Sequence, residues 1–338
     1  MIKSLKLIAA AGSVVAMAAV AHSATLDDVR ARGVLNCGTS TGLAGFSFTN
    51  DAGEWEGFDV AVCRAVAAAV LGDASLVSVK PTTPKERFTV LRSGEIDMLA
   101  RNTTWTYSRD VDLQLTFTGV NYYDGQGFMV PANLGVTSAT QLNGASVCIQ
   151  TGTTTELNLA DYFRVNGMSY EPVPIDTNDE ARENYLAGRC DVYTTDRSGL
   201  AATRAVFENP DDHIVLPEVI SKEPLGPLVR QGDDQWADIV RWVLNVMIIA
   251  EEIGLTSANV AQHASSAGNN PEINRILGTE GEYGPMMGLG QDWAVHVISQ
   301  VGNYGEVYAK NLNPIGLAER GVNALWTQGG ILYAPPYR

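Results

Sequence analysis

The stretch GEIDMLARNTTWTYSR, residues 94–109, decides the fold class of this chain. Gly94 ends a helical segment, and residues 96–99 predict a short buried strand. The polar residues 101–104 follow at once, so they lie beyond the carboxyl end of that strand. In open α/β sheets this edge is where ligands bind. The stretch therefore predicts a parallel sheet with a ligand site at its carboxyl edge.

An arginine completes the same stretch. Thr106 can cap the turn that follows, and this turn presents Arg109. Its guanidinium is planar, permanently charged and suited to a carboxylate. We therefore expect a site for a small zwitterion.

The residues before this stretch supply the rest of a β-α-β-α-β unit. Residues 34–38 and 76–80 have the pattern of strands, and residues 58–71 form an alanine-rich amphipathic helix. Thr83-Pro84-Lys85-Glu86 is a typical helix start, with Thr as the cap and Pro in the first turn. Alternating strands and helices predict a parallel sheet flanked by helices.

A second unit of the same kind lies 94 residues further along the chain. Gly94 and Asp97 correspond to Gly188 and Asp191 at this offset, and Asn102 corresponds to Asp196. The match is short, so chance similarity between two αβ units is the alternative. The functional interpretation is two matching lobes that face each other across a cleft.

The second lobe also contains a predicted anion site. Residues 147–150 form a strand, and Thr153 and Glu156 have the spacing of a capping box at the start of the next helix. The first N–H groups of that helix point toward the cleft.

Longer elements follow from apolar spacing. Residues 120–130 predict one glycine- and aromatic-rich strand that enters the second lobe, and residues 236–250 predict a long helix that rejoins the first. Residues 292–311 predict a single helix within the tail.

Residues 1–23 have the pattern of a secretory signal peptide. Lys3 and Lys6 precede an apolar run over residues 7–20, and Ala21-His22-Ser23 offers small residues at the cleavage positions. The alternative, a membrane helix, needs about 20 apolar residues, and this run is shorter. We therefore expect export and a soluble periplasmic protein.

The charge of the chain disfavours some partners. The 338 residues carry a net charge of −15, and loss of the signal peptide leaves 21 basic and 38 acidic side chains, a net charge of −17. An acidic surface disfavours nucleic acid and anionic membranes.

The cysteines predict disulfides rather than a metal site. Four cysteines in an exported chain allow three pairings. Pairing within each region gives Cys37–Cys63 and Cys148–Cys190, which we prefer; four free buried thiols are the alternative. No short Cys-x-x-Cys spacing occurs, and we expect no metal or other cofactor.

Taken together, these motifs resemble those of family 3 periplasmic solute-binding proteins of polar amino-acid ABC importers. The resemblance covers roughly residues 26–262. It is carried by Gly57-Phe58-Asp59, Gly94-x-x-Asp97, Thr103-Thr104…Arg109, Gln150-x-Gly152-Thr153-Thr154 and Gly188-Arg189-x-Asp191…Asp196. The longer tail and the sequence of residues 102–106 resemble those of the general L-amino-acid-binding subgroup.

The resemblance implies a set of ligand contacts. Arg109 would hold the α-carboxylate, assisted by Thr154 and the adjacent Thr153. Thr104 and the carbonyl of Asn102 would hold the α-ammonium, and Asp196 would be its counter-charge. The ligand would thus bridge the lobes and favour their closure.

Other residues near these motifs have two interpretations each. Arg101 either meets an acidic ligand side chain or pairs with a nearby acid. Trp105 either packs within its lobe, which we favour, or lines the site, and Tyr122 and Tyr123 are assigned to packing at the hinge.

Two positions depart from the binders of cationic amino acids. Those proteins carry an acid directly after the Gly-Thr that ends the first strand and an aromatic residue three positions later. Here Ser40 and Leu43 stand at these places. Both replacements favour a roomier pocket and broad specificity.

The resemblance implies an α/β, two-lobed periplasmic-binding-protein-like (type II) fold, each lobe a mostly parallel sheet flanked by helices, joined by two crossing strands. The first lobe would comprise residues 24–126 and 224–338 and the second residues 130–220. The hinges would be residues 127–129 and 221–223. We expect a monomer whose partners are an L-amino acid and inner-membrane permease subunits.

Two other functional classes are alternatives. The first is a periplasmic enzyme of the same fold, such as a cyclohexadienyl dehydratase, which needs a general acid in the cleft. Glu156 is the nearby candidate, and its expected capping role already explains it. The second is the sensor domain of a receptor, which the lack of a later apolar span disfavours.

Overall fold

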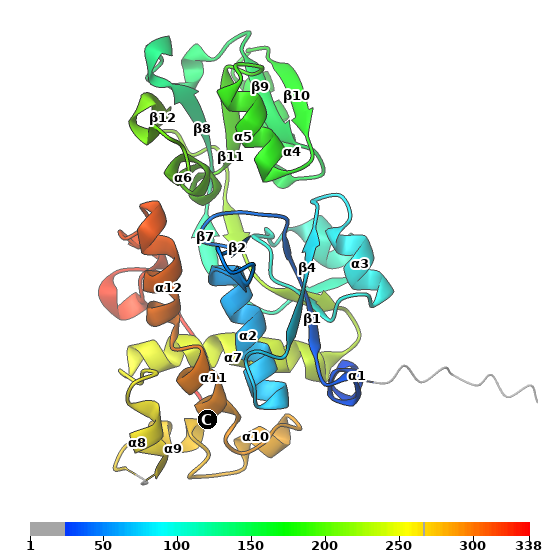
Figure 1. The fold of residues 1–338 in the computed structure, drawn as a ribbon, viewed down its shortest axis with the longest axis vertical. Coiled ribbons are helices and arrows are strands. Elements are labelled where there is room, and N and C mark those ends of the chain that lie inside the picture. Colours follow the sequence, from blue (N-terminus) through cyan, green and yellow to red (C-terminus); the bar gives the residue numbers. More distant parts are fainter. Residues whose placement is uncertain (1–23, 266–267) are drawn as a thin grey trace, which may run out of the picture.

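The computed structural model describes residues 24–265 and 268–338, so the predicted signal peptide lies outside the described residues. The chain forms two lobes, one above the other, each built on a five-stranded sheet (Figure 1). The strands are β1 Leu35–Ser40, β2 Phe48–Thr49, β3 Trp55–Glu56, β4 Val77–Thr82, β5 Met98–Leu99, β6 Leu115–Phe117, β7 Tyr122–Asp124, β8 Gln126–Pro131, β9 Ser146–Gln150, β10 Glu171–Ile175, β11 Val192–Asp196, β12 His213–Val215, β13 Glu223–Leu225 and β14 Leu228–Arg230.

Helices cover both sheets and form the tail. The α-helices are α1 Thr25–Arg32, α2 Phe58–Leu71, α3 Arg87–Ser93, α4 Thr154–Val165, α5 Asn178–Leu186, α6 Arg197–Ala205, α7 Asp234–Glu252, α8 Val260–Ser265, α9 Pro271–Ile276, α10 Tyr283–Met286, α11 Trp293–Gln300 and α12 Tyr304–Leu312. Among the described residues, none of these helices combines the length and apolarity needed to cross a membrane.

The two sheets share one plan. The strand orders are β4-β1-β5-β14-β6 and β10-β9-β11-β8-β12. In each sheet four strands run in one direction, and one strand, β14 or β8, runs against them. The prediction of a two-lobed α/β fold with mostly parallel sheets is confirmed.

Alternating side chains along the strands place helices on both faces of the second sheet. Phe128 belongs to the buried cluster that contains Phe163 of α4. Its neighbour Met129 belongs to the cluster that contains Tyr185 of α5 and Leu200 of α6. Since successive side chains of a strand point to opposite faces, α4 covers one face and α5 and α6 the other.

The repeated motif has the same structural role in both lobes. Asp97 donates its N–H to Asn36 O (2.8 Å), and its carboxylate accepts the Asn36 N–H (2.8 Å). Asp191 does the same with Ser146, at 2.9 Å and 3.0 Å. Each Asp thus binds the start of a neighbouring strand, β1 or β9. Each glycine ends a helix at positive φ, +82° for Gly94 and +68° for Gly188.

Both predicted disulfides are present. Cys37–Cys63 joins β1 to α2, and Cys148–Cys190 joins β9 to the segment before β11. The alternative of four free thiols is wrong.

Two predicted elements need correction. The expected strand over residues 120–130 is two strands, because Gly125 separates β7 from β8. A side chain at Gly125 would lie 2.3 Å from Val219 Cγ1 and 2.8 Å from Ser221 O, where the two crossing segments approach each other. Residues 127–129, the expected first hinge, pair with residues 193–195 inside the second sheet.

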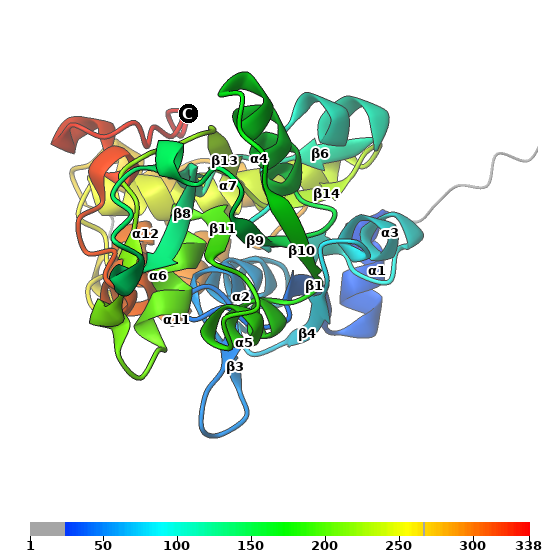
Figure 2. The ribbon, with the colours of Figure 1, turned by 90° about the horizontal axis from the view of Figure 1, so that it is seen from above.

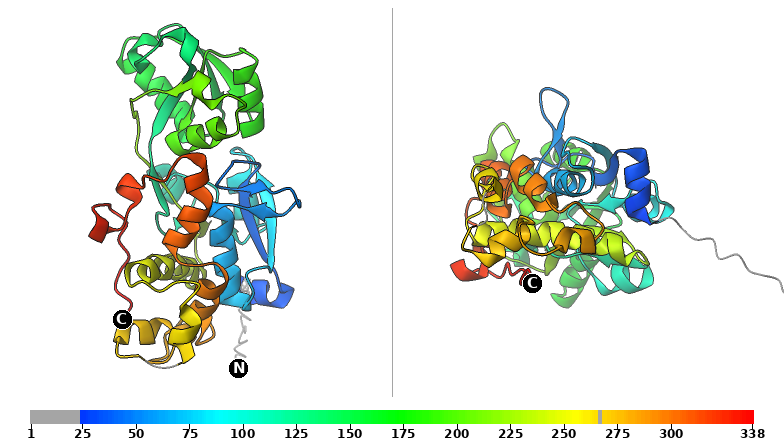
Figure 3. Two further views of the ribbon diagram at one scale, coloured as in Figure 1. Left: turned by 60° about the vertical axis from the view of Figure 1, so that its left-hand side comes forward. Right: turned by 90° about the horizontal axis from the view of Figure 1, so that it is seen from below.

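The expected helix over residues 292–311 is also wrong, because the chain forms α11 and α12. Gly302 adopts φ +102° between them, and Asn303 begins α12 with a capping box to Glu306. Figure 3 shows α11 and α12 rising along the first lobe, and the turn after α12 packs against α6 of the second lobe.

Candidate functional site

A cavity of about 40 Å3 lies between the carboxyl edges of the two sheets. The first lobe contributes Ser40, Leu43, Arg87, Arg101, Asn102 and Thr104 to its wall, and the second contributes Gln150, Thr153, Thr154, Thr155, Asn178, Thr195, Asp196 and Gly199. Seven of the eight predicted site residues therefore lie together. Arg109 is the exception, because it lies behind the wall.

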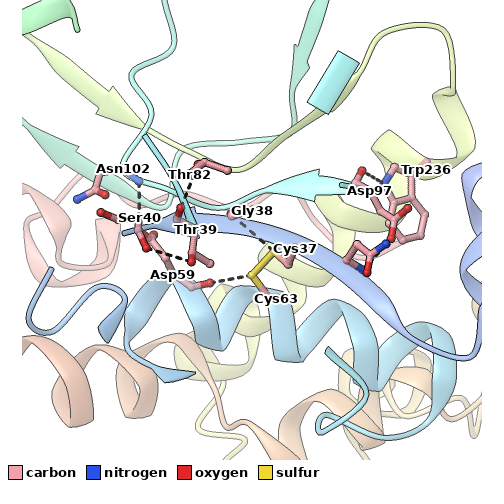
Figure 4. Close-up of a disulfide and its surroundings, with 11 residues drawn as sticks. Cys37, Gly38, Thr39, Ser40, Asp59, Cys63, Thr82, Asp97, Asn102 and Trp236 are labelled. Carbon is pink, nitrogen blue, oxygen red and sulfur yellow. Dashed lines mark hydrogen bonds between the residues drawn. A yellow bond between two sulfur atoms is a disulfide. The ribbon is translucent and has the colours of Figure 1, made fainter. Parts of the chain in front are cut away.

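The carbonyl of Asn102 is held in position by a buried acid. Asn102 adopts φ +28°, and its N–H donates to Asp59 Oδ2 (3.1 Å). Asp59 lies on α2 one turn before Cys63, whose disulfide with Cys37 ties this helix to β1 (Figure 4). Burial raises the pKa of Asp59 to about 7, and the Asn102 N–H and the Arg101 charge oppose the rise. The Asp59 carboxylate thus holds the strained backbone of Asn102 in place.

Arg109 reaches the cavity through a neighbour. Thr106 Oγ1 accepts the Arg109 N–H (3.3 Å), as the predicted cap requires. The Arg109 guanidinium donates to the Thr104 carbonyl (2.8 Å) and lies 5.2 Å from the centre of the Phe88 ring. Burial lowers its pKa to about 10, so the group stays charged at neutral pH.

The helix start in the second lobe differs in one detail from the prediction. Thr153 Oγ1 accepts the Glu156 N–H (3.1 Å), which is the expected cap. The Glu156 carboxylate accepts from Gly152 N–H (2.9 Å) rather than from Thr153. Since α4 begins at Thr154 on the cavity wall, its first N–H groups lie at the site, a position that favours an anion.

Asp196 is the acid of the site. Its Oδ1 is fully buried and has no hydrogen-bond partner among the described residues. Burial, together with the nearby carboxylates of Asp124 and Glu223, holds its pKa well above the usual range, and Arg109 and Arg87 act against the rise. A buried carboxylate oxygen without a partner is costly, and a cation in the cavity would satisfy it.

Glu223, on the crossing strand β13, was not predicted. It is 1% exposed, and its carboxylate accepts from four side chains. Oε2 accepts from the hydroxyls of Thr104 and Thr154 (3.0 Å for Thr154), and Oε1 accepts from Asn158 and Ser221 (2.7 Å each). One carboxylate therefore connects the first lobe, helix α4 and the crossing segment.

The lobes touch at the mouth of the cavity. Asn178 Nδ2 donates to Ser40 Oγ (3.1 Å) and to Gly42 O (2.9 Å) across the cleft. Lys85 pairs with Asp176 at 2.6 Å, also between the lobes. The structure therefore represents a closed arrangement.

Two cationic side chains, Arg101 and Arg87, belong to the cavity wall. Arg101 donates Nε to the Thr82 carbonyl (3.0 Å), and burial lowers its pKa to about 10 despite the Asp59 charge. Arg87 is 3% exposed and lies 4.7 Å from the Phe88 ring centre. Trp105 is 40% exposed and stacks on Phe117, so it is not part of the wall.

Sequence reasoning missed Arg87, Asn178 and Glu223. Arg87 follows the helix-start motif Thr83-Pro84-Lys85-Glu86, so its position near the cleft could have been noticed. Asn178 follows the cap residue Thr177 after a strand of the second sheet, which is also a strand-end position. Within the described ranges, no group of three or more His, Cys, Asp or Glu side chains is arranged to hold a metal ion.

The family model of bacterial extracellular solute-binding proteins, family 3, matches residues 35–256. This chain belongs to that family. The match covers both sheets and ends after α7, so the tail helices lie beyond it.

Close relatives match nearly the whole chain. The glutamate/glutamine/aspartate/asparagine-binding protein BztA of Rhodobacter capsulatus is 56% identical, covering 95% of this chain and 96% of its own. The general L-amino acid-binding periplasmic protein AapJ of Rhizobium johnstonii is 55% identical, covering 98% and 99%. A periplasmic binding protein of an ABC transporter from Brucella ovis, solved with glutathione bound, superposes with a TM-score of 0.90 at 54% identity, covering 94% and 100%.

Proposed function

We propose that this protein captures free L-amino acids in the periplasm and delivers them to the permease of an ABC importer. Family membership and the names of the relatives support the proposal. The observation that carries it is one cavity lined by Asn102 and Thr104 from one lobe and by Thr154 and Asp196 from the other. Groups suited to an ammonium and to a carboxylate thus lie within the reach of one small zwitterion.

Each end of the zwitterion has candidate partners. The α-ammonium would satisfy the buried Asp196 Oδ1 and would donate to Asn102 O and Thr104 Oγ1. The α-carboxylate would lie toward the start of α4 and Arg109. Because a buried zwitterion needs every charge paired, this arrangement would favour amino acids over singly charged analogues.

Lobe closure follows from the same contacts. We infer that residues 24–124 and 224–338 move as one lobe and residues 126–220 as the other, with hinges at Gly125 and residues 221–223. The ladder of β8 with β11 supports the shift of the first hinge from residues 127–129 to Gly125. A ligand that contacts both lobes stabilises the closed form by its differential contacts.

Broad specificity is the favoured range of ligands. BztA is named for four amino acids and AapJ for L-amino acids in general. The relative solved with glutathione supports γ-glutamyl compounds as a second ligand class, because these also carry a free α-amino and α-carboxylate group.

We infer that the protein is a monomeric solute-binding protein, exported by the signal peptide of residues 1–23. We also infer that it is not a dehydratase. The Glu156 carboxylate is occupied by the Gly152 N–H and does not line the cavity, so it is poorly placed as a general acid. Purified protein should leave prephenate and arogenate unchanged, and turnover of either would contradict the inference.

The direct test is native mass spectrometry of freshly purified protein, followed by calorimetric titration with the twenty amino acids and with glutathione. We expect co-purified amino acids and binding of several types at micromolar or lower Kd. Tight binding of one amino acid and none of the others would refute broad specificity. Failure to bind any would refute the function.

A further inference from the structure

The end of helix α12 brings the tail against the second lobe. The turn η5, Asn313–Ile315, follows α12 and packs against α6, a helix of the second lobe. Figure 1 shows α6 above the end of α12, and Figure 2 shows α6 over α12 in the view from above. The family model ends at residue 256, so the features shared by the family do not account for this contact.

Ala202 of α6 is buried at the contact. It is 0% exposed, and it belongs to the buried cluster that contains Leu43 of the first lobe and Leu312 and Ile315 of the tail. The two apolar clusters of the second lobe do not include it. In the part of the chain that the structure describes, it is the only residue of 126–220 in the first-lobe cluster. The first lobe and the tail therefore remove this side chain from water.

The other side of the corner rests on the loop that follows β1. A Cβ added to Gly45 would lie 2.8 Å from Asn311 O and 2.8 Å from Ile315 Cδ1, so the loop and the corner are in close contact. The same loop carries Leu43, which lines the cavity. Residues 311–315 thus lie between the rim of the site and α6.

Polar contacts hold α12 on the first lobe. Tyr304 Oη donates to Asn121 O (2.7 Å). Arg320 pairs with Glu251 of α7 at 2.5 Å, and its guanidinium lies 5.2 Å from the Tyr304 ring centre and 5.0 Å from that of Tyr308. Because α12 is anchored in this way, we expect η5 to move with the first lobe. Its contact with α6 then exists only when the lobes are closed.

We propose that residues 311–315 form a latch, which we define as an apolar surface that receives Ala202 of α6 and stabilises the closed form. This proposal rests on the proposed function, because a latch matters only if a ligand closes the lobes. The affinity of a ligand that binds the closed form depends on how readily that form is populated. The tail therefore raises the affinity for different amino acids by the same factor, without touching any of them.

The first test changes the α6 side of the latch. Ala202→Glu places a charge in the apolar contact, which destabilises the closed form but not the open form, where the side chain faces water. The Kd should rise by about 10-fold or more, and by the same factor for alanine and glutamine. Stopped-flow measurements should show that most of the loss is faster dissociation. The matched control, Ala205→Glu at the exposed end of the same helix, should bind as wild type.

The second test changes the tail side of the latch. Ile315→Ala removes apolar surface from the same contact and should weaken both ligands by a smaller factor than Ala202→Glu. Two residues that act through one contact do not have additive effects. The double variant should therefore bind no more weakly than Ala202→Glu alone. Losses that multiply in the double variant would overturn the latch.

Closure itself can be measured by small-angle X-ray scattering. At an alanine concentration that saturates the wild-type protein, Ala202→Glu should remain more expanded than wild type. Wild-type affinity in Ala202→Glu would overturn the latch. Failure of this variant to fold while Ala205→Glu folds would also overturn it, because Ala202 would then belong to the core of its own lobe. Absence of amino-acid binding by the wild-type protein would instead overturn the proposed function.

Discussion

Asn323 and Tyr123 exchange two hydrogen bonds although 200 residues separate them in the chain. The Tyr123 N–H donates to Asn323 Oδ1 (2.7 Å), and Asn323 Nδ2 donates to the Tyr123 carbonyl (2.9 Å). Tyr123 lies on β7, which pairs with β13 as the ribbon between the lobes. The tail beyond residue 256, which the family model does not cover, is therefore hydrogen-bonded to the β7–β13 ribbon.

This contact predicts a stability role for Asn323. Asn323 is 3% exposed, so Asn323→Ala would leave the N–H and C=O of Tyr123 without partners. Each unpaired buried group costs about 1–3 kcal/mol. We expect urea denaturation to show a loss of that order in the free energy of unfolding. Gln328→Ala, at an exposed position of the same tail, should change it by less than about 0.5 kcal/mol. Equal effects of the two variants would contradict this role of the tail.

Arg109 is expected to control affinity. Arg109→Ala would remove the buried cation proposed to face the α-carboxylate, and breaking a buried ion pair costs about 3–5 kcal/mol. Amino-acid affinity should therefore fall by at least 100-fold in calorimetric titration. Arg109→Lys retains the charge but loses the planar fork, so a smaller loss is expected. Arg164→Ala, on the surface of α4, is the matched control and should bind as wild type. An Arg109→Ala variant that is folded and keeps its affinity would exclude this role.

The acids of the site predict that binding strengthens as the pH rises. Burial raises the pKa of Asp124 to about 6. Burial and the nearby Asp124 and Glu223 carboxylates also hold the pKa of Asp196 above its ordinary value. A ligand ammonium prefers the ionised form, so binding expels a proton whenever the carboxyl is protonated beforehand. Affinity should thus increase between pH 5 and 8, by at most about tenfold per pH unit for one proton.

The stability of the free protein should change in the opposite direction. An acid whose folded pKa is raised stabilises the fold below its unfolded pKa, and this contribution is lost as the pH rises through the folded pKa.

The proton released on ligand binding can be measured by titrations in buffers of different ionisation enthalpy. Asp196→Asn should bind weakly and with a much flatter pH profile. A profile as steep as that of wild type would assign the proton to another group.

The strand ends were predictable because they follow from local pattern and a general rule. Residues 96–104 encode a buried strand and then a polar turn, and residues 192–196 repeat the plan, so Asn102 and Asp196 could be assigned to one cleft. The carboxyl edges of parallel strands meet there whatever the rest of the chain does. The pairing of the four cysteines followed equally from their regions.

Contacts made across the fold were not predictable in this way. Asn178 reaches Ser40 and Gly42 over more than 130 residues, and Glu223 joins partners from three segments. Asn178 stands at a strand end, but no local spacing indicates its partners across the cleft, and Glu223 has no such signal at all. The break between α11 and α12 was hidden by apolar residues that continue the helical period on both sides of Gly302. The positive φ of Gly302 interrupts the helix, and the Asn303 cap begins α12.

Glu223 provides the last prediction. Its carboxylate has only acceptor oxygens and meets four donors, from Thr104, Thr154, Asn158 and Ser221. Glu223→Gln preserves the shape, but its NH2 group cannot accept the hydrogen bonds that one carboxylate oxygen accepts, so two of the four contacts must reverse or be lost. The free energy of unfolding should fall by about 1–3 kcal/mol, and Glu319→Gln at an exposed position should leave it unchanged.

The same substitution should move the pH profile of binding. The Glu223 charge raises the pKa of both Asp124 and Asp196. Its removal should shift the midpoint of the affinity profile to lower pH, so the variant would bind better relative to wild type at pH 5 than at pH 8. A stability loss without this shift would mean that Glu223 only holds the crossing strand in place and does not tune the charge of the site.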